Sequence, residues 1–175
     1  MKTYLEIKVP IRYDENWFIE LRKAAVGLTV KWQEGFYHIT MAFIDETPEN
    51  IDLCPLLEKH LHYAHAPIIT FDKLDVFTAR SGMYIIHLTA TKIPEDFLAL
   101  TEVIRSEMRS IGCRIDSDFR LHVTLGRVKD PGIHLTNLKR ITDFVPLLPF
   151  SITLSDVDYR VFRGRTIYET KLGLK

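Results

Sequence analysis

Two short strings constrain this chain most, because each sets a His-x-Thr triplet in a run of alternating apolar residues. They are Tyr37-His38-Ile39-Thr40-Met41-Ala42-Phe43 and Leu121-His122-Val123-Thr124-Leu125-Gly126-Arg127. Such alternation is typical of a half-buried β-strand, in which residues i and i+2 share a face. We therefore expect one apolar, buried face on each strand: Tyr37, Ile39, Met41 and Phe43 in the first, and Leu121, Val123 and Leu125 in the second. His38 and Thr40, and His122 and Thr124, then lie on the opposite faces.

The chain divides into two halves with the same expected order of elements: strand, helix, His-x-Thr strand, helix, strand. The first half predicts strands at 3–9 and 67–78 and helices at 15–27 and 47–64, the second helix beginning at Thr47-Pro48. The second half predicts helices at 94–112 and 134–144, with further strands at 83–91, from 149 and at 165–174.

This order indicates an α+β (α/β-like) fold with two pseudo-symmetric lobes of mainly antiparallel sheet and outer helices. We expect a single domain over residues 1–175, with lobes at roughly 1–80 and 81–175, since a chain of 175 residues fits one domain with a substantial core. Each lobe would give one His-x-Thr strand to a central cleft.

The composition narrows the class of protein. Hydrophobic residues make up 46% of the chain, and 23 basic residues balance 23 acidic ones. This indicates neither disorder nor a broad basic surface, so nucleic-acid contact is expected only locally. Cys54 and Cys113 match no metal or redox spacing, and neither a signal peptide nor a membrane-spanning run is apparent. We expect a reduced, cytoplasmic monomer with no membrane partner.

Other histidines compete with the two motif histidines. His87-Leu88-Thr89 and His134-Leu135-Thr136 also fit His-x-Thr. His87 falls in the opening strand of the second half, and His134 follows a turn signal and is expected to begin a helix, so we interpret both as chance matches outside the cleft. A metal site at His60, His62 and His65 is disfavoured, because helical spacing does not align them and no further ligand completes a set.

The motif residues suit acid–base chemistry at a phosphate. An imidazole titrates near pH 6.5, so one histidine can be neutral while the other is protonated. One could take a proton from water while the other protonates a leaving oxygen, and threonine hydroxyls could donate hydrogen bonds to phosphate oxygens. Arg163 and Arg165 flank a turn, where they are either solvated hairpin charges or phosphate contacts.

On these residues the chain resembles the 2H phosphoesterase superfamily, especially its RNA 2′,3′-cyclic phosphodiesterase (2′-5′ RNA ligase-like) branch. The opening strand up to Pro10 and the run 30–43 look like the family's start and its first motif. Residues 122–127 look like its second motif, and 168–172 resemble its last strand. The likeness covers nearly the whole chain, and the paired spacing makes it specific.

The resemblance implies that His38 and His122 are the catalytic pair and that Thr40 and Thr124 bind phosphate oxygens. It further implies substrate contacts from Arg127 and Tyr4. Neither a metal nor a cofactor is expected, and the first-motif histidine would be the acid and the second-motif histidine the base.

The sequence also departs from the family at a position that bears on substrate. Glu6 shares a strand face with Tyr4, where the family tends to be small and apolar. A carboxylate there would repel a substrate phosphate or hold a histidine protonated. We expect hydrolysis of a 2′,3′-cyclic phosphate or a related RNA-end or nucleotide phosphodiester. The alternatives are a binding module that holds a nucleotide or RNA end without turnover, and RNA-end ligation as the reverse reaction.

Overall fold

The computed structural model describes residues 1–116, 118–130 and 132–174. Its main sheet has the strand order β11-β10-β1-β3-β8-β6-β5, with β2 paired to β8 and β7 paired to β3, and β4 and β9 form a separate pair. The strands are β1 (Thr3–Lys8), β2 (Val30–Trp32), β3 (His38–Glu46), β4 (Ile68–Phe71), β5 (Lys73–Thr78), β6 (Tyr84–Thr89), β7 (Arg114–Ile115), β8 (Val123–Val128), β9 (Phe150–Thr153), β10 (Asp156–Val161) and β11 (Thr166–Lys171). The helices are α1 (Asn16–Ala24), α2 (Cys54–Leu61), α3 (Glu95–Ser110) and α4 (Leu135–Phe144).

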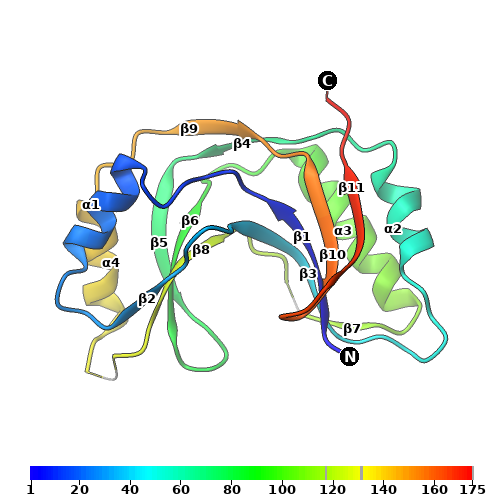
Figure 1. Ribbon diagram of the computed structural model, residues 1–175, viewed down its shortest axis with the longest axis horizontal. Coiled ribbons are helices and arrows are strands. Elements are labelled where there is room, and N and C mark those ends of the chain that lie inside the picture. The colour runs from blue at the N-terminus through cyan, green and yellow to red at the C-terminus, as the bar shows by residue number, and fades with distance from the viewer. Residues whose placement is uncertain (117, 131, 175) are drawn as a thin grey trace.

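The sheet bends into an arch with two arms, and the helices lie on its outer side (Figure 1). The first arm comprises β11, β10, β1 and β3, with α2 and α3 outside it, and the second comprises β8, β6 and β5, with α1 and α4 outside it. Neighbouring strands of the main sheet run antiparallel throughout the described residues. The expected α+β fold with outer helices is therefore confirmed.

The two arms do not coincide with residues 1–80 and 81–175, so the expected lobe boundary is wrong. Strand β5, from the first half of the sequence, pairs with β6, and β10, from the second half, pairs with β1. The first half of the sequence therefore passes β5 to the second arm, and the second half passes β10 and β11 to the first arm. The pseudo-symmetry survives, since β1 lies between β3 and β10 just as β6 lies between β8 and β5.

The predicted helix at 47–64 begins later in the structure, and the predicted strand at 67–78 is divided. Helix α2 begins at Cys54, with Pro55 in its first turn, rather than at Thr47-Pro48. Proline lacks an N–H and has a helical φ, so Pro55 fits the start of the helix. The strand expected at 67–78 is divided at Asp72, because β4 leaves the main sheet to pair with β9.

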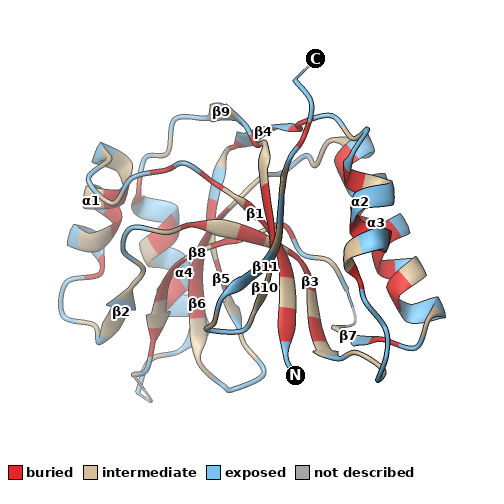
Figure 2. Ribbon diagram, turned by 45° about the vertical axis from the view of Figure 1, so that its right-hand side comes forward, coloured by how far each residue is buried: buried red, intermediate tan, exposed pale blue. Residues whose placement is uncertain are grey.

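The core lies between the outer face of the sheet and the helices, and Figure 2 shows the buried positions on the helix sides that face the strands. Ile39, Met41, Val123 and Leu125 are fully buried there, as the alternation predicts. We call the opposite side of the sheet, which no helix covers, the inner face. Burying one face of β3 and β8 leaves their polar residues on the inner face.

A bulge in each motif strand changes the direction of later side chains. In the pairing of β1 with β3, Leu5 is opposite Ala42 and Glu6 is opposite Thr40, so Met41 is an extra residue. Phe43 therefore turns to the inner face, where its ring lies 5.6 Å from that of Phe162, and its expected place on the buried face is wrong.

The second bulge lies at the equivalent position of β8. Ile86 is opposite Gly126 and His87 is opposite Thr124, so Leu125 is the extra residue. Gly126 is buried and Arg127 is half-buried on the inner face.

Candidate functional site

The two His-x-Thr strands meet at one point of the sheet. Among the described residues, β3 and β8 share a single ladder pair, Ile39 with Val123. Both are fully buried toward the core, so their neighbours His38, Thr40, His122 and Thr124 face the other way. Beyond this pair the two strands diverge: β3 goes on to pair with β7, and β8 goes on to pair with β2. The structure thus brings together the four residues that the sequence singled out, on the inner face where the arms join.

A hydrogen bond determines the tautomer of His122. Its Nδ1 lies 2.9 Å from the backbone carbonyl oxygen of Arg120. A carbonyl can only accept, so Nδ1 carries the proton and the neutral ring keeps a free lone pair on Nε2. Burial lowers the pKa of His122, which favours this neutral form. His122 is therefore arranged as a proton acceptor.

His38 has a different environment. Its Nε2 lies 3.6 Å from a carboxylate oxygen of Glu6, and its Nδ1 is buried without a hydrogen-bond partner among the described residues. Burial, followed by repulsion from the positive charges of His122, Arg127 and Arg160, lowers the pKa of His38 to about 4. These charges act on His38 because the inner face gathers them around it.

Arg127 and Tyr4, the remaining expected substrate contacts, are also on the inner face. The β8 bulge brings Arg127 there, and its Nη1 donates to Gln33 Oε1 at 3.2 Å. Burial and then the charge of Arg163 lower the pKa of Arg127, so these two cations lie near enough to repel each other. The ring of Tyr4 lies 5.9 Å from that of His38.

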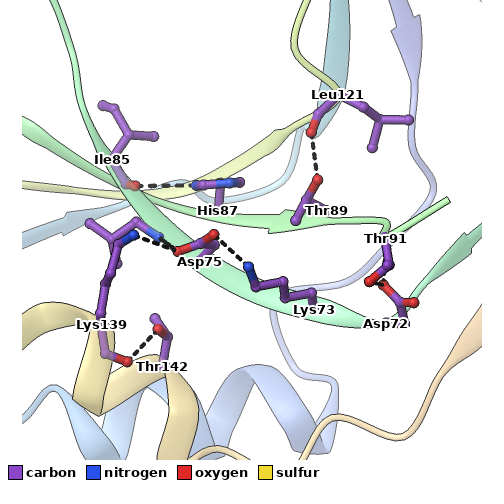
Figure 3. Close-up of polar contacts among 11 residues, drawn as sticks. Asp72, Lys73, Asp75, Ile85, His87, Thr89, Thr91, Leu121, Lys139 and Thr142 are labelled. Atoms are coloured by element: carbon purple, nitrogen blue, oxygen red, sulfur yellow. Dashed lines mark hydrogen bonds and ion pairs between the residues drawn. The ribbon is translucent and has the colours of Figure 1, made fainter. Parts of the chain in front are cut away.

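The structure places His87 beside the site, so its expected position away from the motif histidines is wrong. Its buried ring lies 5.9 Å from that of His122, and Phe77 lies 5.0 Å from His87 and 5.1 Å from His122. The reason is the pairing of β6 with β8, which puts His87 opposite Thr124. Burial lowers the pKa of His87 to about 4, and its Nδ1 contacts the carbonyl oxygen of Ile85 (Figure 3).

The same strand supports the second motif through Thr89. Its hydroxyl donates to the carbonyl oxygen of Leu121 at 2.6 Å, as Figure 3 shows. Leu121 precedes His122, so this bond ties the backbone of the motif to β6. The His-x-Thr match at 87–89 is therefore a neighbour of the site, whereas His134 is exposed at the N-cap of α4, where a helix start was expected.

Other residues at the site were not found from the sequence. Phe36 lies 5.3 Å from the ring of His38, and the guanidinium of Arg160 lies 6.0 Å from the Tyr4 ring and 5.8 Å from that of Phe36. Arg160 and Phe162 come from β10 and the turn after it, which reach the site only because β10 joins the other arm. No local motif marks them.

The histidines at 60, 62 and 65 do not form a metal site. His60 contacts Glu107 across the α2–α3 interface at 2.5 Å, and the described residues contain no group of three or more potential metal ligands among His, Cys, Asp and Glu. Within the described part of the chain, no helix has the length and apolar character needed to cross a membrane.

Comparisons with known proteins bear on the family and the fold. The family model described as the 2'-5' RNA ligase superfamily matches residues 31–167. No curated protein matches the sequence significantly.

Similar solved structures share the fold at low sequence identity. TT0787 of Thermus thermophilus is 18% identical, with a TM-score of 0.62 over 98% of both chains. Usb1 of Kluyveromyces marxianus with uridine monophosphate is 13% identical, with a TM-score of 0.61 over 98% of both chains. E. coli LigT complexed with 3'-AMP is 18% identical, with a TM-score of 0.54 over 98% of this chain and 95% of its own. With the family match over most of its length, the chain belongs to the 2'-5' RNA ligase superfamily and shares the fold of these solved structures.

Proposed function

We propose that this phosphoesterase-family protein is a metal-independent phosphodiesterase that hydrolyses a 2′,3′-cyclic phosphate at an RNA end or on a nucleotide. The observation that carries the proposal is the Ile39–Val123 pair, which puts both His-x-Thr motifs on one face of the sheet. A binding site for an anion alone would not need two imidazoles with different surroundings. The nucleotides in the complexes of Usb1 and LigT support a substrate of this size and charge.

The geometry supports distinct roles for the histidines. His122 Nε2 takes a proton from water, because Nδ1 already carries the ring proton toward the Arg120 carbonyl. The water oxygen bonds to phosphorus, the bond from phosphorus to the ribose 3′ oxygen breaks, and His38 gives its proton to that oxygen. The product carries phosphate on the 2′ oxygen, and each histidine contributes about 10²–10⁴-fold.

The remaining inner-face groups bind the phosphate in this proposal. The hydroxyls of Thr40 and Thr124 donate to its non-bridging oxygens, where charge develops as water attacks. Arg127 supplies positive charge beside them, and Tyr4 forms the wall next to His38. Arg163 extends the positive region from the turn after β10, where a further RNA phosphate would bind.

Hydrolysis of a 2′,3′-cyclic mononucleotide in metal-free buffer, followed by phosphorus NMR, tests the proposal. A 2′-phosphate product is expected, and a 3′-phosphate product would mean that the roles are exchanged. His38→Ala should slow a substrate with a ribose leaving group by about 10²-fold or more, and a nitrophenyl ester far less, since nitrophenolate leaves without an acid. His122→Ala should slow both alike, because both need activated water.

His134→Ala is the matched control, since His134 is exposed and away from the inner face. The main alternative is a module that binds without turnover. Tight binding of a nucleotide with no product from any cyclic phosphate, RNA end or nitrophenyl ester would favour that alternative and overturn the proposal.

A further inference from the structure

Glu6 is a buried acid at the centre of the candidate site. Its side chain is 0% exposed, yet neither carboxylate oxygen has a hydrogen-bond partner among the described residues. One oxygen lies 3.6 Å from His38 Nε2 and the other 3.7 Å from Arg160 Nη1. Buried polar groups without partners are rare and costly, so this carboxyl group calls for an explanation.

The charges around Glu6 do not neutralise it fully. On its own strand, Tyr4 and Lys8 share the inner face, and β10 contributes Asp158 opposite Glu6 and Arg160 opposite Tyr4. Lys8 is paired with Asp158 at 3.0 Å, and Arg160 donates to the carbonyl oxygen of Gly164 at 2.8 Å. From β3, Thr40 lies directly opposite Glu6 in the ladder, and His38 is the titratable neighbour.

Burial then favours a neutral pair. It raises the pKa of Glu6 to about 7, with Asp158 adding to the rise and Arg160 and Lys8 opposing it. It also lowers the pKa of His38 to about 4. A proton shared by the two groups therefore resides on Glu6 when no anion is bound.

We propose that Glu6 and His38 act as one acid–base pair holding a single proton, with Glu6 the positioning residue that keeps this proton available to His38. The inference rests on the proposed function for its catalytic consequence, but the pairing itself is a property of the protein without substrate. It explains how a histidine whose burial disfavours its charged form can still serve as the acid.

The proton moves in three balanced steps. When a phosphate anion binds near His38, it stabilises the imidazolium, so the proton passes from the Glu6 carboxyl to His38 Nε2 and leaves a carboxylate. The separation of 3.6 Å must close to about 3 Å for this transfer. The imidazolium then gives a proton to the leaving 3′ oxygen, and the Glu6 carboxylate is protonated again from solvent.

Loss of the shared proton would weaken binding of the substrate phosphate and would also remove the acid that protonates the leaving group. The pair would become anionic, so it would repel the substrate phosphate, and no acid would remain for the leaving group. Activity and anion binding should therefore fall together as the pH rises through the titration of the pair.

NMR titration of the protein without substrate tests the pairing directly. In the wild type, the Glu6 carboxyl carbon should show a transition near pH 7, and the His38 Nε2 signal should move at the same pH, because it loses its proton donor. In Glu6→Gln, the His38 signal should show no transition near pH 7. Identical His38 titrations in the two proteins, or a Glu6 transition below pH 5, would overturn the inference.

Sulfate is a suitable anion for the second measurement, because it does not titrate in this range. With saturating sulfate at pH 6.5, His38 should become doubly protonated in the wild type and stay neutral in Glu6→Gln. Glu49→Gln, a change at an exposed glutamate in the loop before α2, is the matched control and should behave as the wild type.

Kinetics separate the pair from the proposed function. Glu6→Gln should lower kcat for the cyclic nucleotide by about 10²-fold or more, leave the nitrophenyl ester nearly unchanged, and remove the rise of KM above pH 7. Asp158→Asn should move the alkaline limb of the wild-type profile to lower pH, because Asp158 raises the pKa of Glu6.

The outcomes distinguish the two proposals. Absence of turnover in the wild type would overturn the proposed function. The titration without substrate would still show whether Glu6 and His38 share one proton. Turnover with the same pH profile in the wild type and Glu6→Gln would overturn the pair alone.

Discussion

Replacing Glu6 by Gln should make the protein more stable at alkaline pH, by an amount that follows from the burial of the carboxyl group. The pKa of Glu6 rises from 4.5 to about 7 in the folded protein. Between these values the folded protein binds more protons than the unfolded chain, so the free energy of unfolding falls as the pH rises. Below pH 4.5 the carboxyl is neutral in both states and this loss is absent.

The free energy of unfolding has lost its full share from Glu6 once the pH exceeds the pKa of Glu6 in the folded protein. At pH 8 this loss amounts to about 3 kcal/mol, taking about 1.4 kcal/mol for each pH unit between the two pKa values. The side chain is 0% exposed, so solvent screening does not reduce this figure as it would for a surface group. Gln has the same shape without the charge, and it removes the loss.

Urea unfolding at pH 5 and pH 8 measures this difference. Glu6→Gln should match the wild type within about 1 kcal/mol at pH 5 and exceed it by about 3 kcal/mol at pH 8, which corresponds to roughly 6–12 °C in Tm. At pH 5 and pH 8 the His38 ring is mostly neutral in both folded proteins, because its pKa is lowered to about 4, so its contribution nearly cancels in the comparison. Glu49→Gln should show no such dependence, and a Glu6→Gln protein no more stable at pH 8 than the wild type would refute the reasoning.

Further predictions concern the metal, the second motif and the bulge. Activity should survive EDTA, and complete loss with rescue by a divalent ion would reveal a missed site. His87→Ala should lower kcat by about tenfold or less, since His87 packs beside His122, and a loss as large as that of His122→Ala would give His87 a catalytic role. Thr89→Val should cost about 0.5–1.5 kcal/mol in urea unfolding through the lost bond to the Leu121 carbonyl. Gly126→Ala should cost about 1–3 kcal/mol, because its Cβ would lie 2.8 Å from side-chain atoms of the β2 strand, and unchanged stability would contradict this packing.

The sequence was sufficient for features that depend on neighbours along the chain. Period-two alternation predicted that Ile39 and Val123 are buried and that the histidines and threonines beside them are not, as the structure has it. The repeated order of strands and helices predicted an antiparallel sheet with two related parts. The same repeated order predicted that the two His-x-Thr strands lie close together, because equivalent elements of two pseudo-symmetric units meet at the axis that relates them. The Ile39–Val123 pair agrees with this prediction.

Features that depend on strand pairing were decided by the tertiary structure. A bulge adds one residue against a partner strand, so alternation could not reveal that Phe43 turns inward. The same holds for Arg127 on β8. Sequence position likewise put His87 away from His122, because the register of β6 on β8 is not a local property.

The exchange of β5 and β10 between the arms has the largest consequence for the candidate site. It brings Asp158 and Arg160 against Glu6, which lies near the opposite end of the chain. The pKa of Glu6 depends on how completely it is buried and on these charges, both of which come from packing between distant segments. The sequence alone therefore predicted which residues share the inner face where the two motif strands meet, while the tertiary structure decided the burial and the neighbouring charges that shift their pKa values.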